Sequence, residues 1–321
     1  MMTRLLKLIP FLLGGALLAG LCGCSPHEFP EEGYGEYSVR LVFDEELPLL
    51  TTVRPGTKAV SDAVQTRYTV QLFPYRGEMV FSLVPEYTYS FTRDELEDLE
   101  TTLNLPLTGD RYRVAVWTDW VDGDGISSWD PASFEDIALS ADYRSGDRQR
   151  DAFFGTADIA LSREGLSEPV TIEMHRPVAQ IRFILPEAMT FLTGRKIEAS
   201  SLRATLRYTA PLADSFNLLL GQSSGSLEGV SFTSVPWIDP SSGALVFCTD
   251  FVLANDVQEQ VTVDFSLADA SGAVLFSYQG EVPVLRAHRT DVSWGYDPGD
   301  IDKPGGVGID PGFETEIEIN L

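Results

Sequence analysis

The feature that most limits the fold of this chain is a pair of extended runs near its middle, Val170–Met174 and Val178–Leu185. In both runs apolar and polar residues alternate, which places the side chains of a β-strand on opposite faces. Pro177 lies between the runs and has no amide hydrogen to donate to a ladder. It therefore suits a point where one sheet ends and the next begins, and we predict two β-domains that meet there.

Short runs of the same kind recur along the chain between turns that contain glycine and proline. The clearest is Glu36–Phe43, which places Tyr37, Val39, Leu41 and Phe43 on one face. Many short strands separated by turns are typical of β-sandwiches, so we predict an all-β fold. The other expected strands are Tyr68–Phe73, Tyr112–Trp117, Asp151–Gly155, Ala157–Leu161, Leu202–Tyr208, Ala244–Asp250, Val261–Leu267 and Val274–Tyr278.

One segment has a helical pattern instead, Thr92–Leu103. Thr92 and Glu95 are spaced as a capping box, acidic residues follow in the first turn, and leucines recur at helical spacing. We predict one short helix in the first domain, lying across a sheet.

Residues 1–23 have the order of a lipoprotein signal peptide. Arg4 and Lys7 precede an apolar run, and Leu21–Cys24 has the pattern of a bacterial lipobox. The apolar run is shorter than the roughly 20 residues of a membrane-spanning helix, which makes a transmembrane segment the weaker alternative. We expect removal of residues 1–23 and lipidation of Cys24, with palmitate among several acyl chains, because one chain alone holds a protein only marginally. Residues 24–34 are then a lipidated tether.

The cysteine count agrees with an exported lipoprotein. Cys22 leaves with the signal peptide and Cys24 carries lipid, so Cys248 alone remains and the mature chain has no intramolecular disulfide. Cys248 lies in an apolar strand run, and we predict a core residue rather than a nucleophile.

The formal net charge is −25, and this excess of acidic residues fits a soluble surface. It argues against nucleic acid as a partner, because phosphate binding needs clustered cations. The three histidines, His27, His175 and His288, are scattered, and no catalytic, metal-binding or phosphate-loop motif is visible. We expect no enzyme, no cofactor and no metal; a glycosidase that uses two carboxylates needs no motif and stays a minor alternative.

The most tempting local cluster follows the run Tyr112–Trp117. Carboxylates of the Asp122–Asp124 loop could offer oxygens to Ca²⁺, and Trp120 and Trp129 could stack on a sugar. EF-hand spacing fails here, and Asp-Gly-Asp-Gly is typical of a tight turn. Trp120 and Trp129 nevertheless support an alternative function, a glycan-binding surface lipoprotein that does not polymerise.

Four motifs, in order along the chain, carry a resemblance to a known family. They are Tyr112–Asp119, His175–Phe183, Pro283–Thr290 and Gly308–Ile319. On these motifs the chain resembles the fimbrillin-like (type V pilus subunit-like) lipoproteins of Bacteroidetes. The resemblance implies two tandem β-sandwich domains of transthyretin-like type, residues 35–175 and 176–321. With the acidic residues behind Cys24, it also implies a place on the surface of the outer membrane or in fimbriae.

In type V pili a protease removes a subunit's first strand after a basic residue, and a strand of a neighbouring subunit takes its place. For this chain the resemblance implies Glu36–Phe43 as the displaced strand. The candidate processing residues are Arg54, Lys58 and Arg67. Pro55 follows Arg54, a departure that favours an uncut anchor as the alternative.

The C-terminal run alternates as a strand does. It can pair within its own sandwich or add to the sheet of another molecule. Its candidate strand-exchange residues are Phe313, Ile317, Ile319 and Leu321.

Together these features predict an outer-membrane surface lipoprotein that acts as a fimbrial or adhesive structural subunit, as shaft, anchor or tip, and assembles by β-strand addition. The expected partners are a membrane through the lipid anchor, copies of itself or other pilus subunits, and a host or glycan receptor.

Overall fold

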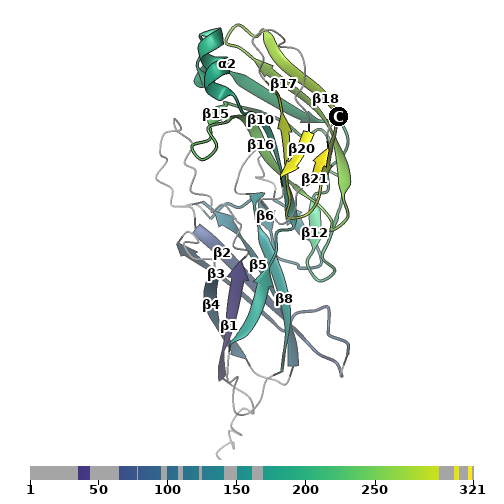
Figure 1. Cartoon of the computed structure of the whole chain (residues 1–321). Helices are drawn as coiled ribbons and strands as arrows, with labels where there is room; N and C mark the ends of the chain where they lie inside the picture. The colour runs from purple at the N-terminus through teal and green to yellow at the C-terminus, as the bar shows by residue number, and fades with distance from the viewer. Residues whose placement is uncertain are drawn as a thin grey trace, which may run out of the picture.

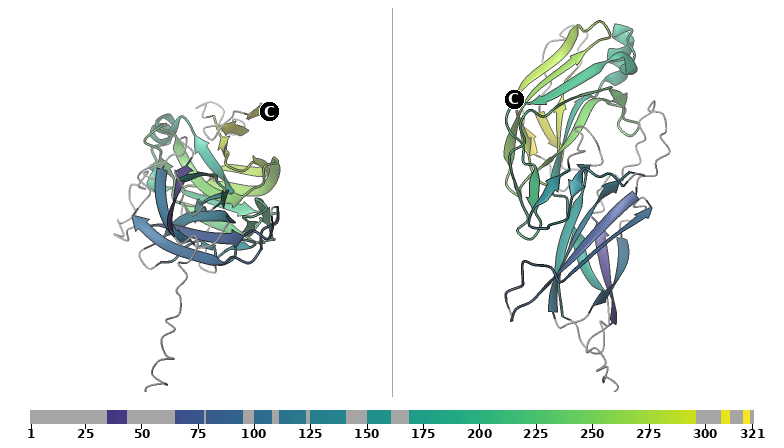
Figure 2. Two further views of the ribbon diagram at one scale, coloured as in Figure 1. Left: turned by 90° about the horizontal axis from the view of Figure 1, so that it is seen from below. Right: turned by 180° about the vertical axis from the view of Figure 1, so that it is seen from behind.

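The structure is a computed structural model in which strands dominate and form five sheets (Figure 1). It describes residues 35–43, 65–77, 79–94, 100–107, 111–122, 125–140, 150–160, 169–295, 307–310 and 317–319. The predicted all-β, sandwich-type fold is confirmed. Two sandwiches are stacked end to end, with the N-terminal strands below and the C-terminal strands above (Figure 1 and, from behind, Figure 2).

The N-terminal sandwich packs a three-stranded sheet, in the order β4-β1-β9, against a four-stranded sheet, in the order β3-β2-β5-β8. The strands are β1 (Gly35–Phe43), β2 (Gln65–Pro74), β3 (Tyr87–Asp94), β4 (Glu100–Leu107), β5 (Arg111–Val121), β8 (Phe153–Ala160) and β9 (Val170–Met174). Alternate residues of both sheets face inward and are buried, as the period of two requires. The two runs expected at 151–155 and 157–161 form one strand, β8.

The helix predicted over Thr92–Leu103 is wrong at both ends. Residues 92–94 belong to β3 and residues 100–103 belong to β4. The reason is that Leu103 and Leu105 alternate as strand residues and lie buried in the N-terminal core, where β4 pairs with β1. Within the described residues the one α-helix is α2 (Ala188–Arg195), in the C-terminal half.

The C-terminal sandwich packs sheet β15-β16-β10-β19-β20-β21 against sheet β14-β11-β17-β18. The elements are β10 (Val178–Leu185), the 3₁₀ turn η2 (Ala199–Ser201), β11 (Arg203–Tyr208), β14 (Ser231–Ser234), β15 (Trp237–Ile238), β16 (Leu245–Leu253), β17 (Glu259–Ala268), β18 (Val274–Val284), β19 (Arg289–Ser293), β20 (Val307–Asp310) and β21 (Ile317–Ile319). The hairpin expected between the runs at 261–267 and 274–278 is present as β17 and β18.

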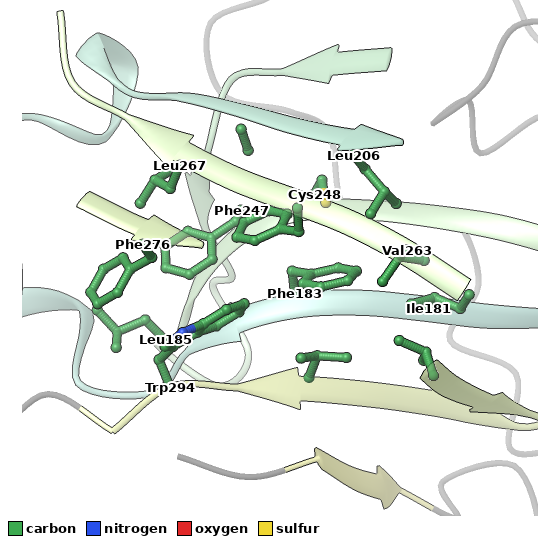
Figure 3. Close-up of a cluster of buried hydrophobic side chains, with 14 of the residues drawn as sticks. Ile181, Phe183, Leu185, Leu206, Phe247, Cys248, Val263, Leu267, Phe276 and Trp294 are labelled. Carbon is green, nitrogen blue, oxygen red and sulfur yellow. The ribbon is translucent and has the colours of Figure 1, made fainter. Parts of the chain in front are cut away.

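Aromatic rings fill the C-terminal core between these sheets (Figure 3). Phe183 stacks on Phe265 with ring centroids 4.4 Å apart, and Trp294 lies 5.1 Å from Phe265. Cys248 is fully buried among them, and burial raises the pKa of its thiol well above the usual value. The thiol therefore stays protonated, and the prediction of a core cysteine is confirmed.

A fifth sheet is built from both halves of the chain. Its order is β13-β12-β7-β6, with β6 (Trp129–Asp130), β7 (Ile137–Leu139), β12 (Ser215–Asn217) and β13 (Gln222–Ser224). The adjoining apolar cluster likewise joins Trp117 and Phe154 of the N-terminal half to Phe216 and Phe251 of the C-terminal half. The domain boundary between residues 175 and 176 stays a prediction; β9 ends just before it and β10 begins just after it.

Two buried ion pairs lie where the sandwiches meet. Arg150 Nη1 donates to Asp250 Oδ1 at 2.8 Å, and the Tyr208 hydroxyl donates to Asp250 Oδ2 at 2.9 Å. Arg176 donates twice to the carboxylate of Asp151, at 2.8 and 2.9 Å. Burial, followed by the Asp250 carboxylate, raises the pKa of Tyr208 well above its usual value, so this hydroxyl keeps the proton that it donates.

At Gly155 the backbone of β8 lies close to β9. A Cβ atom there would lie 2.4 Å from the carbonyl oxygen of Glu173 and 2.6 Å from Cγ2 of Ile172. We expect Gly155→Val to lower the free energy of unfolding by about 3 kcal/mol, because backbone and core would have to move apart. Urea unfolding checks this value against Gly295→Val, where nothing lies within 4 Å of the added Cβ and little change is expected. Equal stability of the two variants would contradict the close approach.

Candidate functional site

The first strand, β1, is the central strand of its sheet. On one side it pairs antiparallel with β4, from Gly35 opposite Leu107 to Val42 opposite Glu100. On the other side it pairs parallel with β9, and Val39 lies opposite Val170. We call the space that β1 fills between β4 and β9 the β1 slot.

The inner face of β1 is apolar and buried. Tyr37, Val39, Leu41 and Phe43 are each at most 3% exposed. The Phe43 ring meets the Phe153 ring of the opposite sheet edge to face, with centroids 5.2 Å apart. The β1 slot therefore accommodates a strand with a large apolar residue at every second position.

The outer face of β1 carries Ser38, Arg40 and Val42 and is partly open to solvent. Ser38 donates to Asn104, and Arg40 donates to Glu100 across the β1–β4 pair. The Arg40 side chain remains 45% exposed, so this ion pair is screened by water and contributes little to stability. β1 is therefore held mainly by its two hydrogen-bonded ladders and by its buried inner face.

Sequence reasoning identified β1 but missed one wall of its slot. Leu103 and Leu105 of β4 line this wall, and the helix prediction had covered Leu103. The signal that could have revealed β4 is the alternation of leucine with polar residues from Leu103 to Leu105.

The candidate strand-exchange residues lie at the C-terminal end. Ile317 and Ile319 belong to β21, which pairs with β20 within the same chain; Phe313 and Leu321 lie outside the described residues. β21 is the last strand of its sheet and has β20 as its hydrogen-bonded neighbour. It is therefore held by one ladder, whereas β1 is held by two.

The candidate processing residues differ in where they fall. Arg54 and Lys58 lie outside the described residues. Arg67 lies within β2, where its guanidinium donates to Asp119 Oδ1 at 2.8 Å and to the carbonyl oxygen of Trp129 at 2.9 Å. A protease could reach the Arg67 peptide only after β2 had left its two neighbouring strands.

The predicted sugar-stacking residues are both buried, which corrects that interpretation. Trp120 is 3% exposed within the N-terminal core, and Trp129 is 1% exposed. Trp129 packs edge to face on Trp117 and donates its indole N–H to the carbonyl oxygen of Arg150 at 3.1 Å. Neither ring has a free face for a sugar in this fold.

Asp119 and Asp122, the acidic residues near these tryptophans, have different partners. Asp119 is fully buried beside Arg67, and burial raises the pKa of its carboxyl against the opposing effect of that arginine. Asp122 accepts from the backbone N–H of Ile126 at 2.8 Å, and Gly125 has φ +77°, as a tight turn requires. In the part of the chain that the structure describes, no group of three or more metal-ligating side chains comes together.

The predicted lipidation site, Cys24, lies outside the described residues. Among the helices of the described ranges, none has the length and apolarity that a membrane crossing requires.

Solved structures of three proteins resemble this chain over most of their length. A candidate adhesin from Bacteroides thetaiotaomicron has 12% identity and a TM-score of 0.47, with 90% of this chain and 98% of that chain covered. A candidate cell adhesion protein from Bacteroides ovatus has 14% identity and a TM-score of 0.48, with 89% and 96% covered. A fimbrial assembly protein from Parabacteroides distasonis has 12% identity and a TM-score of 0.43, with 86% and 95% covered.

Comparison with curated protein sequences finds no match. A protein-family model, in contrast, matches residues 32–321, which include every strand described above. This span starts just before β1 and runs to the last residue. The chain therefore belongs to the family of unknown function DUF6562.

Proposed function

We propose that this chain is an outer-membrane surface lipoprotein, anchored at Cys24, that acts as a fimbrial or adhesive structural subunit and joins its neighbours by β-strand addition. The observation that carries the proposal is the position of β1. It is the first strand of the described chain, yet it lies between two partners and supplies four buried side chains to the core. The proposal contains no catalytic step.

A cut between Phe43 and Gln65 would separate β1 from the rest of the fold without breaking any other strand that the structure describes. Arg54 and Lys58 lie in this interval. Loss of β1 would leave the edges of β4 and β9 unpaired on either side of the slot, and such edges are templates for another strand. An incoming strand in the same direction as β1 would restore both ladders.

The C-terminal run offers a strand of the required pattern. In sequence, Phe313, Thr315, Ile317, Ile319 and Leu321 alternate with polar residues, as the inner face of β1 does. Since β21 has a single neighbour in its own sheet, its release costs one ladder rather than two. A neighbour's C-terminal run is therefore the strand that we assign to an emptied β1 slot.

Without the cut, the slot stays filled and Cys24 stays joined to β1. Such a subunit can still donate its C-terminal run, and this suits an anchor at the base of a fibre. Intact mass and amino-terminal sequence of the protein sheared from its native host distinguish the two roles. A start after Arg54 or Lys58 means a polymerising subunit, and a start at acylated Cys24 means an anchor.

Strand donation itself predicts multimers that resist SDS without heating. We expect Ile317→Asp with Ile319→Asp to abolish them, because charges would enter an apolar slot. The matched control is Glu316→Ala with Glu318→Ala, which changes the opposite face and should leave the multimers intact. Multimers that survive the isoleucine changes, or a lipid-free chain with no multimers, would refute the proposal.

A further inference from the structure

The loop between β2 and β3 carries a group of exposed apolar side chains. Met79 is 88% exposed, Val80 65%, Leu83 56% and Val84 72%. Across the described residues ten large apolar side chains are exposed, and four of them fall in this one loop. Single exposed apolar residues are ordinary, whereas a contiguous group marks a surface for a partner.

The exposure is fixed by the local structure of the loop. Phe81 turns inward, with its ring centroid 6.2 Å from that of Phe73 and 6.0 Å from that of Tyr75. The Ser82 N–H donates to the carbonyl oxygen of Pro74 at 2.8 Å, which closes the base of the loop. Phe81 and Ser82 thus hold the middle of the loop against the sandwich, while the apolar side chains before and after them face solvent.

The loop lies at the same end of the N-terminal sandwich as the start of β1. The N–H of Tyr75 donates to the carbonyl oxygen of Arg111, the first residue of β5. Leu107, at most about 14 Å back along the chain, lies opposite Gly35. In Figure 1 the blue loop and the first residues of β1 both lie at the lower end, away from the C-terminal sandwich. The tether from Cys24 to Gly35 is at most about 40 Å long when fully extended.

The base of the loop is surrounded by side chains with an apolar body and a polar tip. The guanidinium of Arg111 lies 4.1 Å from the ring centroid of Tyr75, and that of Arg113 lies 4.5 Å from the ring centroid of Phe81. Such side chains are favoured at the boundary between a hydrocarbon layer and water. An apolar tip above an aromatic and arginine base therefore suits a surface that rests on a bilayer.

We propose that Met79–Val84 enters the surface of the lipid bilayer that holds the anchor, and so fixes the lower end of the N-terminal sandwich against the membrane. The proposal rests on the anchor at Cys24 and is independent of strand addition. A bilayer suits this surface better than a protein groove, because the tip projects and its tether brings it to the membrane.

The test uses the lipidated mature chain in phosphatidylcholine vesicles. A polarity-sensitive dye is attached to Val80→Cys and, in a separate variant, to Val84→Cys. Cys248 is buried and does not react with the dye. The control is Val274→Cys, 62% exposed in the β17–β18 hairpin at the far end of the molecule. We expect a blue shift and severalfold quenching by spin-labelled lipid for dyes at 80 and 84, and neither change at 274.

Three outcomes would overturn the proposal. Dyes at 80 and 84 that behave as the dye at 274 would mean that the loop stays in water. A blue shift that depends on protein concentration and needs no vesicles would assign the loop to contacts between copies of this chain. If intact mass shows no lipid on Cys24, the chain has no anchor there. The proposal then fails at the anchor and not at the loop.

Discussion

Replacing Asp250 by asparagine is expected to lower the free energy of unfolding by about 3 kcal/mol. Asp250 is fully buried and Arg150 is 1% exposed, so the change leaves a guanidinium charge inside the protein without its counter-charge. Asparagine keeps the size of the side chain and an oxygen for the Tyr208 hydroxyl to donate to. The loss of stability therefore measures the cost of leaving the Arg150 charge unpaired. Urea unfolding followed by tryptophan fluorescence measures it.

The matched control is Glu100→Gln, which also removes one carboxylate from an arginine pair. Arg40 and Glu100 are about half exposed, so water replaces the lost charge and the expected cost is below about 1 kcal/mol. If Asp250→Asn cost no more than Glu100→Gln, the junction between the sandwiches would not depend on this buried pair.

Removal of β1 is expected to have a larger effect. A specific protease site placed between Phe43 and Gln65 allows the chain to be cut, unfolded and refolded without residues 24–43. Four buried side chains then leave the core, and the loss of burial is on the order of 6 kcal/mol. That is comparable with the whole stability of a typical domain, so the N-terminal sandwich should lose its cooperative unfolding transition.

A peptide of sequence Gly35–Phe43 should restore the transition. The same peptide with Val39→Ser and Leu41→Ser should fail, because both side chains face the core, whereas Ser38→Ala with Arg40→Ala should still restore it. A truncated protein that unfolds like the intact one would show that β1 is dispensable, and the slot could not drive assembly.

The strands of this fold were largely predictable because alternation is a local property of the sequence. β1, β2, β10 and β17 all lie where a period of two indicated them. The buried inner face of β1 could be predicted for the same reason, as could the core position of Cys248.

The helix prediction failed because its signals were local and the deciding contact was not. A helix cap contributes about 1 kcal/mol. Pairing of β4 with β1, in contrast, buries Leu103 and Leu105 and forms a ladder from Gly35 to Val42. No pattern inside Thr92–Leu103 reports a partner that lies more than 50 residues earlier in the chain.

The burial of the two tryptophans was hidden for a similar reason. The sequence predicts that Trp129 is open to a sugar, yet its ring packs on Trp117, which in turn contacts Phe216, far along the chain. The burial of these tryptophans depends on how the two halves of the chain pack together, and the residues next to them in sequence do not indicate it.

The position of β1 also determines how the molecule would carry tension. If the chain is anchored at Cys24, as proposed, a pull from the anchor enters the fold at Gly35, the first residue of β1. Figure 1 shows β1 rising from the lower end of the molecule, so a pull on that end acts along the strand. The hydrogen bonds to β4 run nearly across that axis, so the pull loads them in shear, all together, rather than opening them one after another. A protein held at a cell surface in flowing liquid would thereby resist detachment at its first strand.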